Sequence, residues 1–139
     1  MKHTLTRDEV IHAIRTEPLL VAGYWVNPNG YAANLEAAID RGCSFCAVGA
    51  VLRSVVDKNM SIERFGHEAY RVARFVDLVL GEFDKREDAP HQALRKGNYM
   101  GALNFFFEQA SEVDPLHARD DTCTFVRDYF PETITFEVP

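Results

Sequence analysis

Apolar residues recur at steps of three and four along residues 42–56, a segment whose only charged side chain is Arg53. Positions three and four apart lie on one face of an α-helix, so this pattern predicts a helix that buries one broad apolar face. The apolar positions of that face are Phe45, Val48, Gly49, Leu52, Val55 and Val56. We therefore expect residues 42–56 to form the central helix of the fold.

Other helical patterns cover most of the chain. Thr6 and Glu9 have the spacing of a capping box, and Pro18 ends the helix that follows them. Ser61 and Asn98 precede two longer patterns and are residue types that cap helices. These signals predict further helices over 7–17, part of 31–41, 62–80, 99–113 and 122–130. Gly81 ends the helix over 62–80, and a short helical piece over 90–95 follows a solvated, charged connection at 84–88.

Two segments have the character of strands. Residues 19–26 are rich in β-branched and aromatic side chains and are followed by a dense turn signal at 27–30. Residues 133–138 alternate strictly between polar and apolar, as a half-buried strand does. The expected fold is mainly α (α+β), a single domain in which five or six helices surround the central helix and a small antiparallel sheet pairs 19–26 with the C-terminal strand.

The composition is that of an ordinary globular protein, with 47% hydrophobic and 26% charged residues. No apolar run reaches the roughly 18 residues that a membrane span needs. The first ten residues lack the apolar core of an export signal. We therefore expect a cytoplasmic protein that does not bind membranes and keeps its three cysteines reduced.

The formal net charge of −6 is concentrated late in the sequence. Residues 1–100 carry equal numbers of acidic and basic side chains, whereas 101–139 carry eight acidic against two basic. An acidic surface repels phosphate backbones, so direct binding to nucleic acid is not expected. The expected partner is another protein, and a homodimer is also compatible with the sequence.

Cys43 and Cys46, in the spacing Cys-x-x-Cys, form the densest group of potentially reactive side chains. They stand where the central helix begins, and a helix N-terminus lowers the pKa of a thiol. The pair is therefore compatible with redox exchange, metal binding or a cysteine nucleophile. A nucleophile needs a base, for which the candidates are His67, His91 and His117.

A structural role for the cysteines is the interpretation we favour. Cysteine is among the most buried residue types, and the small residues Ala47, Gly49 and Ala50 beside the pair favour close packing. Zinc requires two more ligands, and the sequence has no second ligand pair. We predict no metal and no cofactor.

The segment Cys46-Ala47-Val48-Gly49-Ala50 follows the Gly23-Tyr24-Trp25 segment by about twenty residues. This arrangement resembles a family of small uncharacterised bacterial and phage proteins, in which a Trp-containing segment precedes a Cys-Ala-apolar-Gly-Ala helix. The resemblance covers about a third of the chain. It implies a compact accessory protein and assigns no catalytic residue.

Two further features are candidate contact sites. Arg64, His67, Arg71 and Arg74 step by three, four and three, which places them on the face of their helix opposite the apolar one. This basic stripe is either a solvated surface or a site for an anion or an acidic partner. Phe105 falls on the polar side of its helix, where it either packs under a neighbouring segment or forms an interface with another subunit.

Two hypotheses for function follow. The favoured one is a non-enzymatic accessory protein that binds another protein, through the acidic C-terminal region or the basic stripe, with an inhibitory role in a phage or mobile element. The alternative is a small cysteine-dependent hydrolase or thiol transferase with Cys43 or Cys46 as nucleophile.

Overall fold

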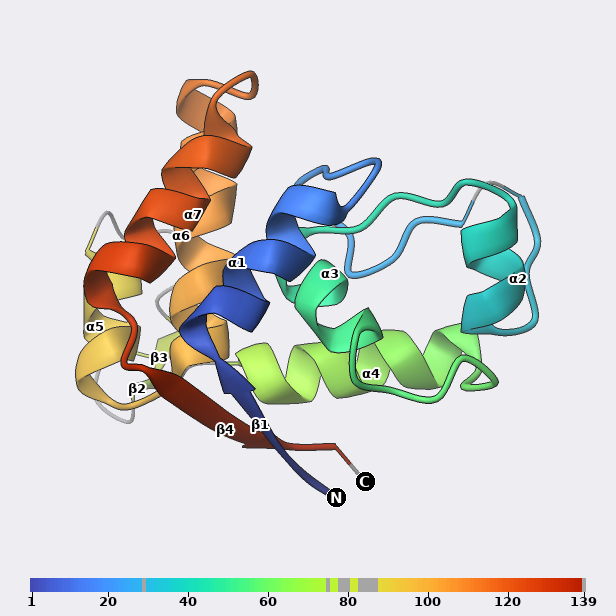
Figure 1. The fold of residues 1–139 in the computed structure, drawn as a ribbon, viewed down its shortest axis with the longest axis horizontal. Coiled ribbons are helices and arrows are strands. Elements are labelled where there is room, and N and C mark those ends of the chain that lie inside the picture. The colour runs from blue at the N-terminus through green and yellow to red at the C-terminus, as the bar shows by residue number, and fades with distance from the viewer. Residues whose placement is uncertain (29, 75, 78–80, 83–87, 139) are drawn as a thin grey trace.

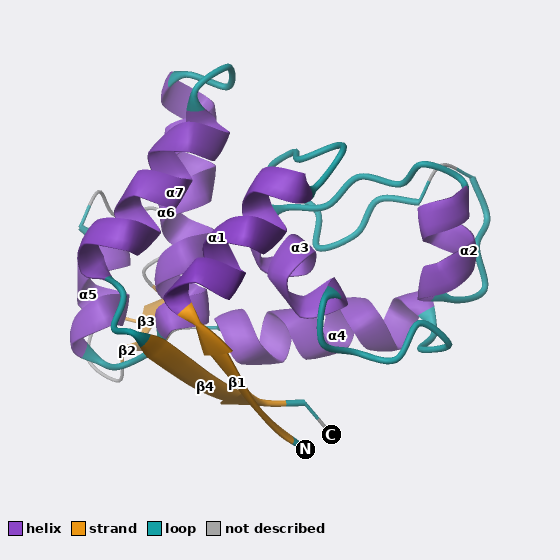
Figure 2. Cartoon of the chain, in the orientation of Figure 1, coloured by secondary structure: helices purple, strands orange, loops and turns teal. Residues whose placement is uncertain are grey.

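The fold is mainly helical and carries a small antiparallel sheet, as expected (Figures 1 and 2). The computed structural model describes residues 1–28, 30–74, 76–77, 81–82 and 88–138. These residues form seven helices, which matches the upper expectation of six helices around a central one. They are α1 (Arg7–Thr16), α2 (Leu35–Asp40), α3 (Ala47–Arg53), α4 (Ile62–Ala73), α5 (Ala89–Arg95), α6 (Tyr99–Val113) and α7 (Ala118–Tyr129).

The central helix, α3, is short and almost entirely enclosed. Six of its seven residues are buried, from Ala47 to Leu52, and it packs against α1, α4 and α6. It begins five residues later than expected, because residues 43–45 are extended and pair with an earlier loop through the bridges Leu20↔Phe45 and Asn27↔Ser44. These bridges satisfy backbone groups that a longer helix would have bonded internally.

The sheet joins the two ends of the described chain. Strand β1 (Lys2–Thr6) pairs antiparallel with β4 (Thr133–Glu137), in a register that sets Leu5 opposite Ile134. Both of these side chains are buried. The prediction that an N-terminal strand pairs with the C-terminal strand is confirmed, but the expected segment, 19–26, was wrong.

Residues 19–26 are irregular, with a single bridge at Leu20. Four of their apolar side chains, Leu20, Ala22, Trp25 and Val26, pack against the core without forming a sheet face. In contrast, β1 contains only one buried residue, Leu5, so its sequence carries almost no alternation. Tertiary packing therefore overrides the strand propensity of 19–26.

Helix α4 ends at Ala73, earlier than the expected residue 80. The backbone is extended at Arg74, whose carbonyl accepts a hydrogen bond from Asn98 Nδ2 at 2.7 Å. Two strands of two residues each follow, and β2 (Val76–Asp77) pairs antiparallel with β3 (Gly81–Glu82). Gly81 therefore belongs to a strand and does not end a helix. Most of the predicted charged connection, residues 84–87, lies outside the described residues.

The remaining helices form two ends of the molecule (Figure 1). Helices α6 and α7 lie side by side as an antiparallel hairpin, with α5 packed on α6, while α2 lies at the opposite end.

The capping box of α1 is present, with the Glu9 amide donating to Thr6 Oγ1 and the Thr6 amide to Glu9 Oε1. No helix within the described residues has the length and apolar character to cross a membrane.

Candidate functional site

Cys43 and Cys46 lie in the core. Their exposed fractions are 5% and 2%, and the third cysteine, Cys123, is 2% exposed on α7. Cys46 is the N-cap of α3, where its Sγ accepts a hydrogen bond from the Gly49 amide at 3.4 Å. All three thiols are free. Cys46 therefore caps the central helix from inside the protein, and Cys43 is buried shortly before it.

Burial raises the pKa of the Cys46 thiol to about 12, and this effect outweighs the hydrogen bonds from the Gly49 and Val48 amides. Burial also raises the pKa values of Cys43 and Cys123. The expectation that the helix N-terminus would lower the thiol pKa was wrong. A thiolate loses more solvation in the core than the short helix returns as stabilisation.

The three histidines proposed as bases lie in other places. His67 is exposed on α4, and the ring of His91 packs edge-on against Phe125 and Tyr129, with centroids 5.8 and 5.0 Å away. His117 forms an ion pair with Asp114 at 2.6 Å. In the described part of the chain none of these histidines hydrogen-bonds to a cysteine, and no three His, Cys, Asp or Glu side chains gather as metal ligands would.

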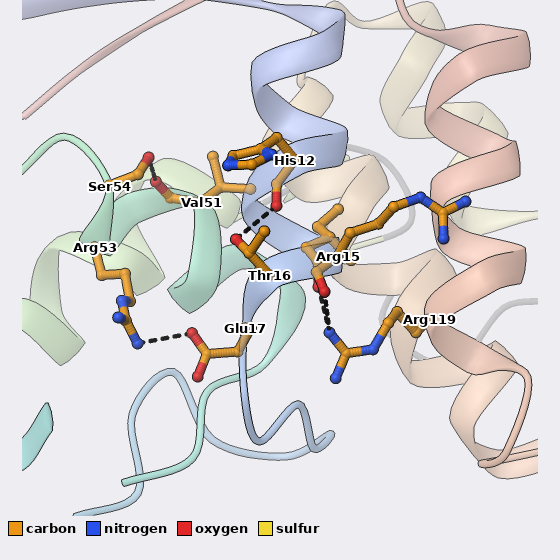
Figure 3. Close-up of polar contacts among 9 residues, drawn as sticks. His12, Arg15, Thr16, Glu17, Val51, Arg53, Ser54 and Arg119 are labelled. Atoms are coloured by element: carbon orange, nitrogen blue, oxygen red, sulfur yellow. Dashed lines mark hydrogen bonds and ion pairs between the residues drawn. The ribbon is translucent and has the colours of Figure 1, made fainter. Parts of the chain in front are cut away.

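A groove of about 800 Å³ runs between α1 and the end of α3, on the side of the central helix where Ala50 and Arg53 lie. At one end, Arg53 Nη1 donates to Glu17 Oε2 at 2.8 Å (Figure 3). The Glu17 side chain is 2% exposed, and its Oε1 has no hydrogen-bond partner among the described residues. Burial raises the pKa of Glu17 more than the Arg53 charge lowers it.

The polar groups around this groove mainly hold helix ends together. Thr16 donates to the His12 carbonyl and Ser54 to the Val51 carbonyl, while Arg119 of α7 donates to the carbonyls of Ile14 and Arg15 (Figure 3). These contacts satisfy the last carbonyls of two helices. Neither Cys43 nor Cys46 lines the groove. The polar side chains of this groove therefore hold α1, α3 and α7 together and have a structural role.

The basic stripe Arg64, His67, Arg71 and Arg74 is exposed along α4, on the face opposite the buried Phe65, Ala69 and Ala73. Arg71 is engaged within the chain, since it donates to Glu68 Oε2 at 3.1 Å and to the Glu137 carbonyl at 2.8 Å. It therefore ties α4 to β4. This contact joins the stripe to the acidic C-terminal part of the same chain.

Phe105, the proposed interface residue, is 4% exposed and lies in the core. Helix α6 packs against α3, α4, α5 and α7, so it is covered on several sides and has no simple polar face. The next residue, Phe106, is half-buried and stacks on Phe125 of α7 with centroids 4.2 Å apart. Phe106, and not Phe105, is therefore the residue of this pair that is partly exposed at the surface.

That surface is a groove of about 380 Å³ between α6 and α7. Its apolar lining comes from Phe106, Ala110 and Val113 of α6 and from Phe125 and Tyr129 of α7. Val113 is 86% exposed and Tyr129 is 54% exposed. Apolar side chains thus line a concave surface that no described segment covers. We call this surface the α6–α7 groove.

Three carboxylates line the α6–α7 groove beside these apolar residues, namely Asp114, Asp121 and Asp128. They recur every seventh residue along one edge. Sequence reasoning located the acidic excess of this region but assigned the possible contact residue of this helix to Phe105 instead of Phe106, so the groove was missed. The seven-residue repeat of aspartates is the signal in the sequence that points to it.

No family model, no curated protein and no solved structure matches this chain. The likeness to small bacterial and phage proteins stays an expectation.

Proposed function

We propose that the protein is a non-enzymatic accessory protein that binds a positively charged segment of another protein in the α6–α7 groove. The observation that carries this proposal is an apolar concave surface, with Val113 86% exposed, edged by three aspartates. Exposed apolar patches with polar rims are typical of protein contact sites.

The charge of the groove decides the class of partner. Carboxylates at the edge repel the phosphates of nucleic acids and of anionic lipid surfaces and attract lysine and arginine side chains. The apolar floor then requires a partner that also buries hydrophobic side chains. A protein segment with basic and apolar residues supplies both. A protein that covers such a segment withholds it from its own targets, which is an inhibitory role.

The other candidate surfaces support this function less well. In the basic stripe on α4, Arg71 already forms hydrogen bonds with Glu68 and Glu137 of the same chain, and surface charge alone is a weak determinant of binding. The cysteine-dependent enzyme lacks an accessible nucleophile, because Cys43 and Cys46 are at most 5% exposed and their thiol pKa values are raised.

The proposal is tested with a matched pair of substitutions. Val113→Asp puts a charge among the apolar side chains that line the groove, and Tyr31→Asp makes the same change in charge at a residue that is 81% exposed in the loop before α2. The protein that the wild type captures from an extract of its native host is purified, and its affinity for each variant is measured. We expect Val113→Asp to weaken binding by about tenfold or more and Tyr31→Asp to change it by less than about twofold. Equal affinity for all three proteins contradicts the proposal.

A further inference from the structure

The spacing of the carboxylates along the α6–α7 groove restricts what fits there. Asp121 and Asp128 both belong to α7 and are seven residues apart. At 1.5 Å per residue, they are separated by about 10.5 Å along the helix axis. Asp114 precedes Asp121 by another seven residues, in the turn at the tip of the hairpin. The α7 side of the groove therefore presents two carboxylates about two helical turns apart.

This interval suits a helix and does not suit a strand. In a helix, residues seven apart share a face and are also separated by about 10.5 Å. In a strand, residues on one face are two or four apart, which corresponds to about 6.7 or 13.4 Å. Only a helical partner lying along α7 brings a basic side chain to each of Asp121 and Asp128 from the same face.

The apolar residues that line the groove on α6 also have the spacing of a helix-packing surface. Phe106, Ala110 and Val113 step by four and three along α6, which places them in one apolar stripe on that helix. Apolar residues of a third helix, also at steps of three and four, pack against such a stripe. Phe125 and Tyr129 of α7 form the opposite wall, and His91 of α5 supports both rings from behind.

We infer that the α6–α7 groove binds an amphipathic α-helix of a partner protein, with apolar residues at steps of three and four and a lysine or arginine at every seventh position beside them. This inference rests on the proposed function and specifies its partner. Charge complementarity selects a basic helix over an acidic one, and the apolar floor supplies the area that is buried.

The carboxylates have neighbours of their own, which set how much each contributes. Asp128 accepts from the adjacent Arg127 at 3.2 Å, in a pair that is 49% and 66% exposed and is weak for that reason. Asp114 accepts from the Leu116 amide and pairs with His117 at 2.6 Å. For Asp121 the described residues show no such ion pair. We therefore expect Asp121 and Asp128 to select the partner more than Asp114 does.

Three synthetic peptides of three heptads each test the inference. All carry leucine at the first and fourth positions of each heptad. The first has lysine at the seventh position, beside the leucine face; the second has the same composition with lysine at the sixth position, on the far face; the third has glutamate at the seventh position. Binding is measured by fluorescence anisotropy, and peptide helicity by circular dichroism.

We expect the first peptide to bind about tenfold or more tightly than the other two. Its affinity falls by about tenfold for the double variant Asp121→Asn, Asp128→Asn. The control Glu36→Gln, Asp40→Asn removes the same charge from exposed positions of the remote helix α2 and leaves the affinity within about twofold. Equal binding of the first and second peptides, or equal effects of the two double variants, overturns the inference.

A failure of the inference can be told apart from a failure of the proposed function. If a purified partner binds the wild type and not Val113→Asp, yet the first peptide fails to compete with it, the groove binds protein but not a basic helix. A second copy of this chain is the other occupant to test, because Arg64 and Arg71 on α4 are also seven residues apart. Concentration-dependent dimerisation that is lost in both Arg71→Glu and Asp121→Asn overturns the assignment to a foreign helix.

Discussion

At the scale of single residues, Gly49 determines how the first loop meets the central helix. A β-carbon at this position would clash with the carbonyl oxygen of Trp25, because the backbone of residue 25 lies directly on α3. Cys46, one turn earlier, donates its amide to the Tyr24 carbonyl. The glycine is therefore required by a close approach of backbone to backbone, and the apolar loop 19–26 is fixed there.

Gly49→Ala should lower the free energy of unfolding by about 3 kcal/mol, because Trp25 and α3 must move apart. Gly66→Ala is the matched control in α4, where the nearest atom to an added β-carbon, Trp25 Cδ1, is 3.9 Å away. That control should stabilise the protein by about 0.5 to 1 kcal/mol, since alanine is the better helix former. Urea unfolding of both variants checks the prediction, and similar effects at the two sites contradict it.

The buried thiols give a second prediction at this scale. Because burial raises the pKa of Cys46 to about 12, Cys46 should resist alkylation by iodoacetamide at pH 8.5 in the folded protein. In urea, all three cysteines should react at rates typical of free thiols. Mass spectrometry of the labelled peptides makes the comparison. Fast labelling of native Cys46, with an apparent pKa below 8.5, would restore the enzyme hypothesis.

At the scale of elements, the pair Glu17–Arg53 ties the end of α1 to the end of α3. The guanidinium also lies over the ring of Phe45, 4.9 Å from its centroid. Arg53→Met should lower the free energy of unfolding by about 3 kcal/mol, because it leaves the buried Glu17 carboxylate without its partner. Arg15→Met, which removes the exposed pair of Arg15 with Asp120, should cost less than about 1 kcal/mol. Equal costs would show that the α1–α3 tie is no stronger than a surface pair.

The pH dependence of stability tests the same pair. The native state holds the Glu17 proton more tightly than the unfolded chain, whose pKa for this group is near 4.5. The contribution of Glu17 is therefore fully present below pH 4.5 and is lost as the pH rises through the raised native pKa. Glu17→Gln does not titrate, so the wild type should lose stability relative to this variant across that window. Parallel pH profiles of the two proteins would rule out the raised pKa.

The helices were predictable from local signals, while the partners of the strands were not. The capping residues Thr6, Ser61 and Asn98 act locally, and each accepts the hydrogen bond expected of it. Strand pairing depends on segments far apart in the sequence, so the apolar loop 19–26 looked more like a strand than β1 does. The early end of α4 has the same cause, since the carbonyl of its C-cap residue, Arg74, is bound by Asn98, 24 residues away.

At the scale of the whole molecule, the β1–β4 pair closes the chain on itself. Ile134 is 2% exposed and packs in the core with Leu5. Ile134→Ala should therefore cost about 3 kcal/mol of unfolding free energy. Thr135→Ala, at the exposed neighbouring position whose hydroxyl group hydrogen-bonds to that of Thr4, should cost less than about 1 kcal/mol. Urea unfolding separates the two, and equal effects would show that the sheet is peripheral to stability.

The α6–α7 groove depends on how the helices pack in the whole molecule. The acidic excess of residues 101–139 was visible in the sequence, but the groove depends on which side of α6 meets α7. That choice follows from the packing of α6 against four other helices, which buries Phe105 and leaves Phe106 at the surface. Periodicity assumes one buried face per helix, and α6 has more than one.

The pairing of β1 with β4 also bears on how the protein is made. Strand β1 is synthesised first, and its partner leaves the ribosome only after 126 intervening residues. At typical translation rates this takes on the order of ten seconds. During that time the helices can assemble, while the edge of β1 stays unpaired and open to other chains. Strand β1 is mostly polar, and Leu5 is its only buried residue, so β1 is less prone to aggregate while it remains unpaired before β4 is synthesised.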